Sequence, residues 1–196
     1  DPRFWRDYRN PVSPLFTDGP IRFVYMGTAT HHADLELVLP AFERLAATNP
    51  GQFILTLIGV TSTPPEAEWL EVCSLPQTAR SYPGFARYVT RNLSFDVGLA
   101  PLARSPFNGA KSDVKFLDYC AMGLLSVVSE GEVYGQAVAD GLAIGCGPSP
   151  DAWYDALAAI VERRNDVAEM RRRAVDHLWV SRNVLTDLHP LADLLP

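Results

Sequence analysis

The sequence contains few of the residues that small disulfide-bonded or cysteine-ligated metal folds require. Only three of its 196 residues are cysteines, and these lie far apart in the chain. They are Cys73, Cys120 and Cys146. Their spacing excludes a disulfide framework and a cysteine-based zinc site, and the apolar neighbours of Cys120 and Cys146 indicate buried thiols. We therefore expect a protein of a reducing, cytoplasmic compartment.

Histidine is also scarce, with four residues in the whole chain. His31 and His32 are adjacent, whereas His177 and His189 lie in a charged helical segment and near the end of the sequence. No recognisable ligand spacing joins these side chains to one another or to Asp34. We expect no bound metal and no cofactor.

Long apolar runs and an excess of positive charge are both absent. No run approaches the eighteen residues of a membrane-spanning helix, and the first residues, "DPRFWRDYRN", do not resemble a signal peptide. The net charge of −6 and the pI of about 5.2 exclude a general affinity for nucleic acid or anionic membranes, so any basic site must be local. Because the sequence does not begin with Met, we expect it to be a piece of a longer protein.

The sequence does contain apolar runs of strand length that alternate with segments of helical periodicity. The expected strands are 21–27, 52–60, 95–102, 124–130 and a shorter one at 141–147. The expected helices are 33–49, a short one after a turn within 61–73, 84–93, 111–122, 149–164 and 165–185. Continuous apolar strands that alternate with helices predict an α/β fold, a Rossmann-like, doubly wound parallel sheet of five or six strands with helices on both faces.

This pattern divides the chain into three parts: a lead or linker segment at 1–20, one domain at 21–180 and a tail at 181–196. In the lead segment, Phe4, Trp5 and Tyr8 are too apolar to stay in water, so we expect them to pack on the domain, near Trp179, or on a missing part of the protein. The alternative is a flexible remnant. In the domain, the carboxyl edge of the sheet should gather Gly27, Pro101, Lys111 and Ser129.

The first strand-to-helix loop, "GTATHHAD", lacks the glycine pattern of dinucleotide-binding folds. Gly27 stands alone, no acidic residue follows the second strand until Glu66, and no Walker sequence is present. Gly27 and Thr28 before a helix form a candidate anion cradle, because free backbone N–H groups point out of a helix start. The alternative is a tight turn capped by Thr30. We expect His31 to face the pocket as a donor to a phosphate or hydroxyl, and His32 to be exposed.

The segment "NGAKSDVKFLDYCAMGLLSVVSE" places two cations at the start of a helix, where the helix dipole favours anions. With Ser112 as the expected N-cap and Lys115 at the third helical position, Lys111, Lys115 and Asp118 are spaced i, i+4 and i+7 on one face. The neighbouring apolar residues predict that Asp118 is close to buried. Two interpretations remain open: a Lys115–Asp118 salt bridge on a solvated stripe, or a phosphate dianion between the two lysines.

"FDVGLAPL", "FNGAKSDVKFLDYCAMGLLSVVSE" and "DAWYDALAAIVERRNDVAEMRRRA" together resemble the C-terminal, nucleotide-sugar-binding domain of GT-B glycosyltransferases of the group 1 type, of the bacterial surface-polysaccharide kind. "GTATHHADLELVLPAFERL" resembles the first loop and helix of that domain. In that family a helix carries an E-x7-E motif whose second Glu binds the donor ribose, and a basic residue before it contacts the diphosphate. Asp118 occupies the place of the second Glu, and Ala110 that of the first.

The resemblance implies a function for the site. The diphosphate of a nucleotide sugar would be bound by Gly27, Thr28, His31, Lys111, Ser112 and Lys115, and its ribose by Asp118. The sugar would pass to a hydroxyl of a glycan or lipid-linked glycan held by an absent N-terminal domain, at a cytoplasmic location or peripherally at the inner membrane. No catalytic residue is identified, and this part alone is expected to be inactive.

Two other functions remain as alternatives. One is a degenerate, non-catalytic GT-B domain that binds a partner protein through the aromatic and basic lead "RFWRDYR". The other is a nicotinamide-dependent dehydrogenase, which the missing glycine fingerprint disfavours.

Overall fold

The computed structural model describes residues 19–28, 31–162 and 167–181. Its strands are β1 (Ile21–Met26), β2 (Phe53–Ile58), β3 (Leu70–Val72), β4 (Val97–Ala100), β5 (Leu125–Ser129) and β6 (Ile144–Cys146). Its helices are α2 (His32–Glu36), α3 (Leu39–Thr48), the 3-10 helix η2 (Gln77–Ala79), α4 (Tyr82–Asn92), α5 (Pro106–Gly109), α6 (Val114–Ala121), α7 (Gly135–Ala139), α8 (Pro150–Glu162) and α9 (Ala168–Ser181).

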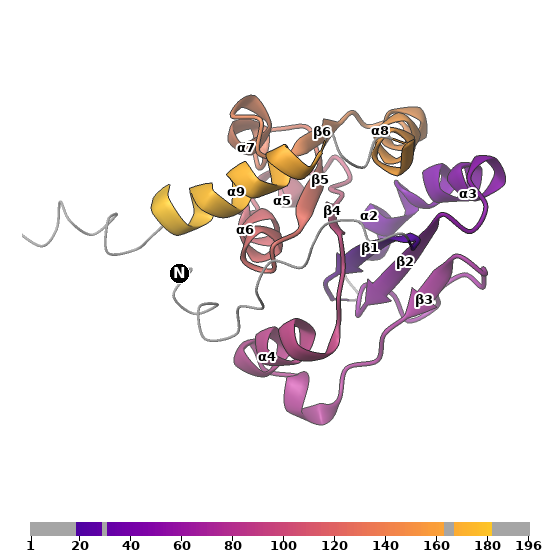
Figure 1. Ribbon diagram of the computed structural model, residues 1–196, viewed down its shortest axis with the longest axis horizontal. Coiled ribbons are helices and arrows are strands. Elements are labelled where there is room, and N and C mark those ends of the chain that lie inside the picture. Colours follow the sequence, from indigo (N-terminus) through magenta and orange to yellow (C-terminus); the bar gives the residue numbers. More distant parts are fainter. Residues whose placement is uncertain (1–18, 29–30, 163–166, 182–196) are drawn as a thin grey trace, which may run out of the picture.

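The six strands form one parallel sheet in the order β3-β2-β1-β4-β5-β6 (Figure 1). β1, β2, β4 and β5 are almost wholly buried, as expected for parallel strands covered on both faces. The predicted fold class is therefore confirmed. β1 lies next to β4, so successive crossovers run away from this pair in opposite directions and open a crevice at its carboxyl edge.

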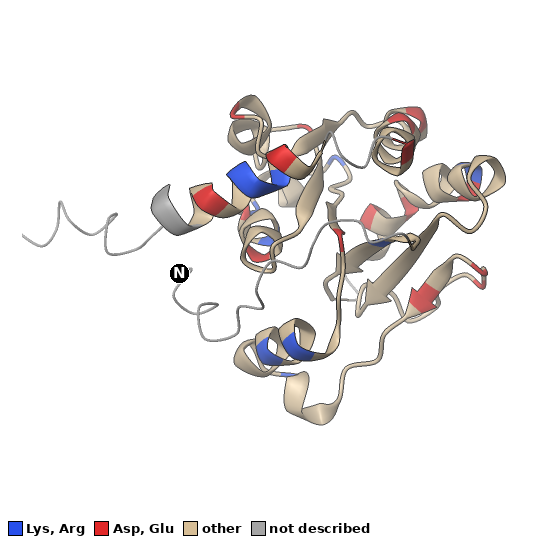
Figure 2. Ribbon diagram, viewed as in Figure 1, with Lys and Arg blue, Asp and Glu red and all other residues tan. Residues whose placement is uncertain are grey.

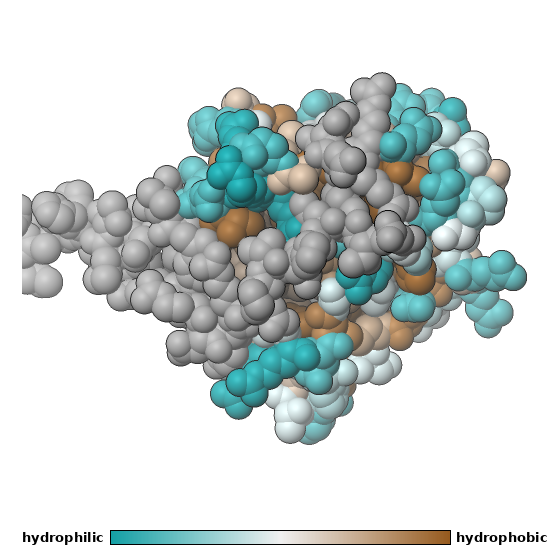
Figure 3. All heavy atoms as spheres, in the orientation of Figure 1, coloured by the Kyte–Doolittle hydropathy of each residue, from teal (hydrophilic) through white to brown (hydrophobic). Residues whose placement is uncertain are grey.

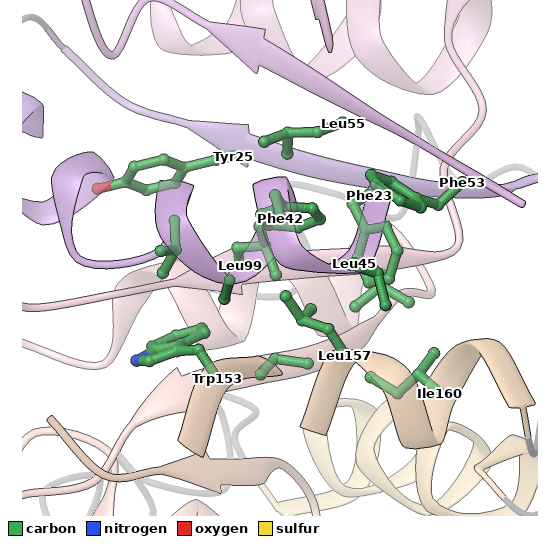
Figure 4. Close-up of a cluster of buried hydrophobic side chains, with 14 of the residues drawn as sticks. Phe23, Tyr25, Phe42, Leu45, Phe53, Leu55, Leu99, Trp153, Leu157 and Ile160 are labelled. Carbon is green, nitrogen blue, oxygen red and sulfur yellow. The ribbon is translucent and has the colours of Figure 1, made fainter. Parts of the chain in front are cut away.

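Helices cover both faces of the sheet. On one face α3 and α8 pack together over the central strands, and their side chains share a core with Phe23, Leu55 and Leu99 (Figure 4). Phe42 of α3 lies edge-on to Phe23, with ring centroids 5.3 Å apart, and stacks on Trp69 at 6.0 Å. On the other face α4, α6 and α9 enclose a second core. The view in Figure 3 shows hydrophilic side chains gathered over α4, α8 and α9.

Two of the expected helices differ from the structure in more than their end points. The helix expected at 33–49 is divided into α2 and α3, because Pro40 has no backbone N–H to donate to the carbonyl four residues earlier and instead occupies the first turn of α3. The short helix expected within 61–73 is instead the edge strand β3. There Leu70 pairs with Leu55, and Trp69 packs on Phe42 and Phe53, so tertiary contacts outweigh the local pattern.

Helix α6 packs directly on β4 through the ring of Tyr119. A Cβ added at Gly98 would lie 2.3 Å from Cγ of Tyr119, so only glycine allows the ring to rest on the strand. The Tyr119 hydroxyl donates to the carbonyl of Leu99 at 2.7 Å. These two contacts fix the height and rotation of α6 on the sheet.

In the described part of the chain, no helix has the length and apolar character needed to cross a bilayer. Phe4, Trp5 and Tyr8, the side chain of Trp179 and the tail beyond residue 181 lie outside the described residues, so the predicted packing of the lead segment stays a prediction.

Candidate functional site

The loops that follow β1 and β4 meet at the carboxyl edge of the sheet. β1 runs into Gly27, whose N–H donates to the carbonyl of Ile58 at 2.9 Å. A Cβ at Gly27 would lie 2.8 Å from Cδ2 of His31 and 3.3 Å from Nζ of Lys115. The absence of a side chain at Gly27 therefore leaves room for both groups beside the backbone.

A pocket of about 580 Å³ opens beside Gly27 and is bounded on its outer side by η2 and α4. Its lining residues are Met26, Gly27, Thr28, Ile58, Leu75, Ala79, Arg80, Ser81, Tyr82, Phe85, Lys115 and Asp118. The floor is apolar, whereas Lys115 and Asp118 place one cation and one carboxylate on the wall that α6 supplies. This pocket can hold an organic ligand that carries both an apolar ring and polar substituents.

Asp34 lies next to this pocket and is 3% exposed. Its Oδ1 accepts hydrogen bonds from the N–H of Ala103 and from Nδ2 of Asn108, each at 2.8 Å. Its Oδ2 lies 2.8 Å from Nδ1 of His31 and 3.6 Å from Nζ of Lys111. Burial alone would raise the pKa of the Asp34 carboxyl, but these hydrogen bonds and the charge of Lys111 together hold it below its usual value. Asp34 is therefore a buried carboxylate.

His31 connects Asp34 to Lys115, since its Nε2 lies 3.2 Å from Nζ of Lys115. The side chain of His31 is 14% exposed and that of His32 is 51% exposed. Burial is the largest effect on His31 and lowers its pKa; the hydrogen bond with Asp34 opposes this, and the charges of Lys115 and Lys111 add to it. A neutral His31 that donates from Nδ1 accepts at Nε2 from the lysine. His31, which we expected to donate a hydrogen bond to a phosphate, is thus separated from the pocket by Lys115.

Lys115 is the lysine that lines the pocket. Burial lowers its pKa most, the charge of Lys111 lowers it further, and Asp34 and Asp118 only partly compensate, so the pKa is about 8. The ammonium also lies 5.4 Å from the ring centroid of Tyr25, within the range of a cation–π contact. Such an ammonium group gains from a ligand that supplies negative charge.

Asp118 is half-buried rather than close to buried, because its side chain reaches the pocket between α6 and α4. The hydroxyl of Tyr82, at the start of α4, donates to its Oδ1 at 2.5 Å. Lys115 contacts His31, and Lys111 pairs with Asp34. Lys115 therefore makes its close contact with His31, while the charge of Asp118 still acts on it.

The helix start also differs from the prediction. α6 begins at Val114, with Asp113 at the N-cap and no side-chain cap hydrogen bond, so Lys115 is the second helical residue. Ser112 is exposed in the connection from α5. Lys111 lies in the same connection and reaches Asp34, which keeps it close to Lys115 although it is not on the helix.

The structure thus brings most of the predicted site residues together. Gly27, Thr28, Lys115 and Asp118 line the pocket, and His31 and Lys111 join it through Asp34, whereas Ser112 is absent from its lining. The sequence reasoning missed Asp34 and Asn108 as buried polar partners, and Tyr82 as a partner of Asp118. Of these three residues, only Asp34 had a local signal in the sequence, which was its position three residues after His31.

A second pocket, of about 330 Å³, lies between the loops after β4 and β5. Ser129, Glu130 and Glu132 line one side, and Arg104 and Asn108 line the other. Asn108 therefore touches this pocket and also binds Asp34, which places the second pocket beside the first along the sheet edge. No group of histidine, cysteine and acidic side chains within 19–28, 31–162 and 167–181 is arranged to hold a metal ion.

The chain matches no protein-family model and no curated protein sequence. Its structure, however, is similar to the C-terminal domain of LpcC, a glycosyl transferase group 1 family protein from Francisella tularensis. The TM-score is 0.59 at 11% identity, over 93% of this chain and 92% of that domain. The fold is that of a GT-B C-terminal domain.

Two larger proteins contain the same GT-B half. WaaG, a glycosyltransferase involved in lipopolysaccharide biosynthesis, matches with a TM-score of 0.61 at 12% identity, over 92% of this chain and 48% of WaaG. A UDP-GlcNAc 2-epimerase from Neisseria meningitidis, solved with UDP-GlcNAc bound, gives a TM-score of 0.50 at 11% identity, over 80% of this chain and 40% of the epimerase. The chain thus spans less than half of each of these GT-B proteins.

Proposed function

We propose that this domain binds the nucleotide diphosphate sugar donor of a glycosyltransferase. The observation that carries the proposal is the pocket wall on which Lys115 and Asp118 stand together beside the side-chain-free backbone of Gly27. A diphosphate needs cations, and a ribose needs a hydrogen-bond acceptor. This wall offers both kinds of group, at the crevice where α/β sheets bind ligands.

The residues suggest an orientation for the donor. The base and ribose would occupy the apolar part of the pocket, near Leu75 and Phe85, with the ribose hydroxyls donating to Asp118. The diphosphate would lie against Lys115, the backbone of Gly27 and Thr28, and Lys111. In this position the two ammonium groups would stabilise the negative charge that develops on the leaving diphosphate as the glycosidic bond breaks.

In the proposed reaction the sugar passes to a hydroxyl of a glycan or lipid-linked glycan, as in surface-polysaccharide synthesis. The acceptor and the second half of the cleft would come from an N-terminal domain, with the enzyme in the cytoplasm or peripheral at the inner membrane. The likeness to two glycosyltransferases, LpcC and WaaG, supports this class of activity.

Calorimetric titration with UDP, GDP, dTDP and NAD tests the proposal. A donor-binding domain binds one or more of the nucleoside diphosphates and not NAD. Binding of NAD alone would indicate a dehydrogenase, and no binding to any of the four would favour a non-catalytic interaction domain.

Replacement of the cations tests the orientation of the donor. Lys111→Ala or Lys115→Ala should weaken binding of the nucleoside diphosphate by about 1.5 to 3 kcal/mol, the range for hydrogen bonds to charged groups. Arg104→Ala is the control, because Arg104 is an exposed cation that lines the other pocket. Thermal unfolding separates loss of binding from loss of folding, and a variant that loses stability while keeping its affinity contradicts the assignment.

A further inference from the structure

The Asp34 cluster, defined as Asp34, His31, Asn108, Lys111 and Lys115, links both lysines of the proposed site to one buried carboxylate. The two oxygens of Asp34 have different tasks. Oδ1 accepts from the backbone of Ala103 and from Asn108, which fixes the orientation of the carboxylate. Oδ2 faces His31 and Lys111. The other ring nitrogen of His31, Nε2, contacts Lys115.

The hydrogen-bond partners determine the tautomer of His31. A carboxylate oxygen has no hydrogen, so the 2.8 Å contact with Asp34 requires a proton on Nδ1. A lysine ammonium has only hydrogens to offer, so the 3.2 Å contact with Lys115 requires a lone pair on Nε2. Only the neutral Nδ1–H tautomer satisfies both contacts.

We infer that Asp34 and His31 are positioning residues, which hold the Lys115 ammonium at the pocket wall through this tautomer while Asp34 holds Lys111 directly. The inference rests on the proposed function for its ligand, the diphosphate of a nucleotide sugar. Neither residue lines the pocket that Lys115 and Asp118 share, so their effect on the ligand passes through the lysines.

Asp34→Asn separates positioning from simple electrostatics, because the two predict opposite signs. At a pH low enough for Lys115 to stay charged in both proteins, removal of one negative charge beside two lysines should strengthen binding of a diphosphate if only charge matters. In the variant, however, the amide oxygen is needed by Ala103 and Asn108, and the amide N–H₂ therefore faces His31 and Lys111. His31 must then accept at Nδ1 and carry its proton on Nε2, where it repels Lys115. Positioning thus predicts weaker binding.

The experiment measures the dissociation constants of wild type, Asp34→Asn, His31→Leu and His31→Gln for the diphosphate that wild type binds most tightly among UDP, GDP and dTDP. We expect Asp34→Asn and His31→Leu to bind it about ten- to hundredfold more weakly. His31→Gln should retain more affinity than His31→Leu, because a glutamine amide can donate to Asp34 and accept from Lys115. The matching nucleoside, which lacks phosphate, should bind all four proteins equally.

Asp96→Asn is the matched control. Asp96 is also a buried, hydrogen-bonded carboxylate, 6% exposed, but it lies at the opposite edge of the sheet, where it accepts from the N–H of Arg22 at 2.9 Å. Its loss should lower stability without changing the affinity for the diphosphate. Unchanged or tighter binding by Asp34→Asn would overturn the inference, and so would an Asp96→Asn variant that is weakened as much as Asp34→Asn.

Nitrogen-15 NMR of the imidazole rings supplies a readout that needs no ligand. In the free wild-type protein, the ring assigned to His31 by its absence from His31→Gln should carry its proton on Nδ1, and in Asp34→Asn on Nε2. A wild-type ring protonated on Nε2 alone would refute the inference even if nucleotides bind. Conversely, a protein that shows the expected tautomers and binds no nucleoside diphosphate would disprove the proposed function and leave the cluster geometry standing.

Discussion

The surroundings of Lys115 disfavour its charged form, and a negatively charged ligand would favour that form. Burial and the neighbouring Lys111 lower its pKa to about 8. The negative charge around the ammonium group is therefore too small to keep Lys115 fully protonated at this pH. Asp34 and Asp118 are the carboxylates that face it, and His31 presents a neutral acceptor. If the proposed function holds, a diphosphate supplies the missing charge, and protonation of Lys115 and ligand binding are then coupled.

We predict that binding of a nucleotide diphosphate sugar at pH 8 takes up about half a proton, because Lys115 is half-charged in the free protein and fully charged in the complex. Affinity should accordingly fall as pH rises through 8. The pKa of His31 is lowered, so His31 stays neutral in this range. Calorimetry of UDP-glucose or GDP-mannose in two buffers of different ionisation enthalpy measures the uptake. Lys115→Arg should abolish it, and an uptake that persists in that variant would rule Lys115 out as the coupled group.

A second prediction at the residue scale concerns the ribose. If Asp118 accepts from the ribose hydroxyls, Asp118→Asn should weaken binding of UDP more than binding of 2′-deoxy-UDP, which lacks one of those donors. Tyr82→Phe should likewise lower the ratio of the affinity for UDP to the affinity for 2′-deoxy-UDP. The reason is that the Tyr82 hydroxyl orients the Asp118 carboxylate through their 2.5 Å contact. Competition binding with both nucleotides measures the ratio. Equal losses for the two nucleotides would remove the ribose assignment.

At the scale of elements, the two helices of the site, α4 and α6, differ in how they begin. α4 has Ser81 as a true N-cap, whose Oγ accepts from the N–H of Gly84 at 3.2 Å, and a proline in its first turn. α6 has no such cap, and Ser112 lies outside it. The sequence could not distinguish these two serines, because each stands shortly before an apolar-periodic segment.

We predict that Ser81→Ala lowers the free energy of unfolding by about 1 kcal/mol, the usual cost of a lost N-cap hydrogen bond. Ser112→Ala should change it by less than about 0.5 kcal/mol, as surface substitutions usually do. Urea denaturation of the two variants, followed by circular dichroism, gives both values. A loss at Ser112 as large as that at Ser81 would show that Ser112 caps α6 after all.

At the scale of the whole molecule, the sheet could be predicted because it depends on continuous apolar strands, and such runs are visible in sequence. The pocket wall was also partly visible, since Lys115 and Asp118 share a helix. Asp34 was not, because its partners Ala103 and Asn108 are 69 and 74 residues away and meet it only once β1 and β4 are neighbours. Overall charge does not mark the site, because Figure 2 shows basic residues on α4, acidic residues on α8 and both kinds on α9.

The two cores predict a separation between stability and binding. Leu157 of α8 is fully buried in the core shared with α3, away from the helices that bear Lys115 and Tyr82. Leu157→Ala should lower the free energy of unfolding by about 2 to 5 kcal/mol. The folded fraction should keep its nucleotide affinity within about twofold. Denaturation and calorimetry below the unfolding temperature provide the two numbers, and a parallel loss of both would show that α8 supports the site.

The contact between Gly98 and Tyr119 bears on how this protein can change over evolutionary time. Any side chain at position 98 meets the aromatic ring, so that position cannot vary while Tyr119 is present. A smaller residue at 119 would leave room for alanine at 98. It would also remove the hydrogen bond to the Leu99 carbonyl and allow α6 to pack differently on the sheet. Since α6 carries Lys115 and Asp118, drift at this pair would alter ligand recognition first. Positions 98 and 119 should therefore covary among homologues.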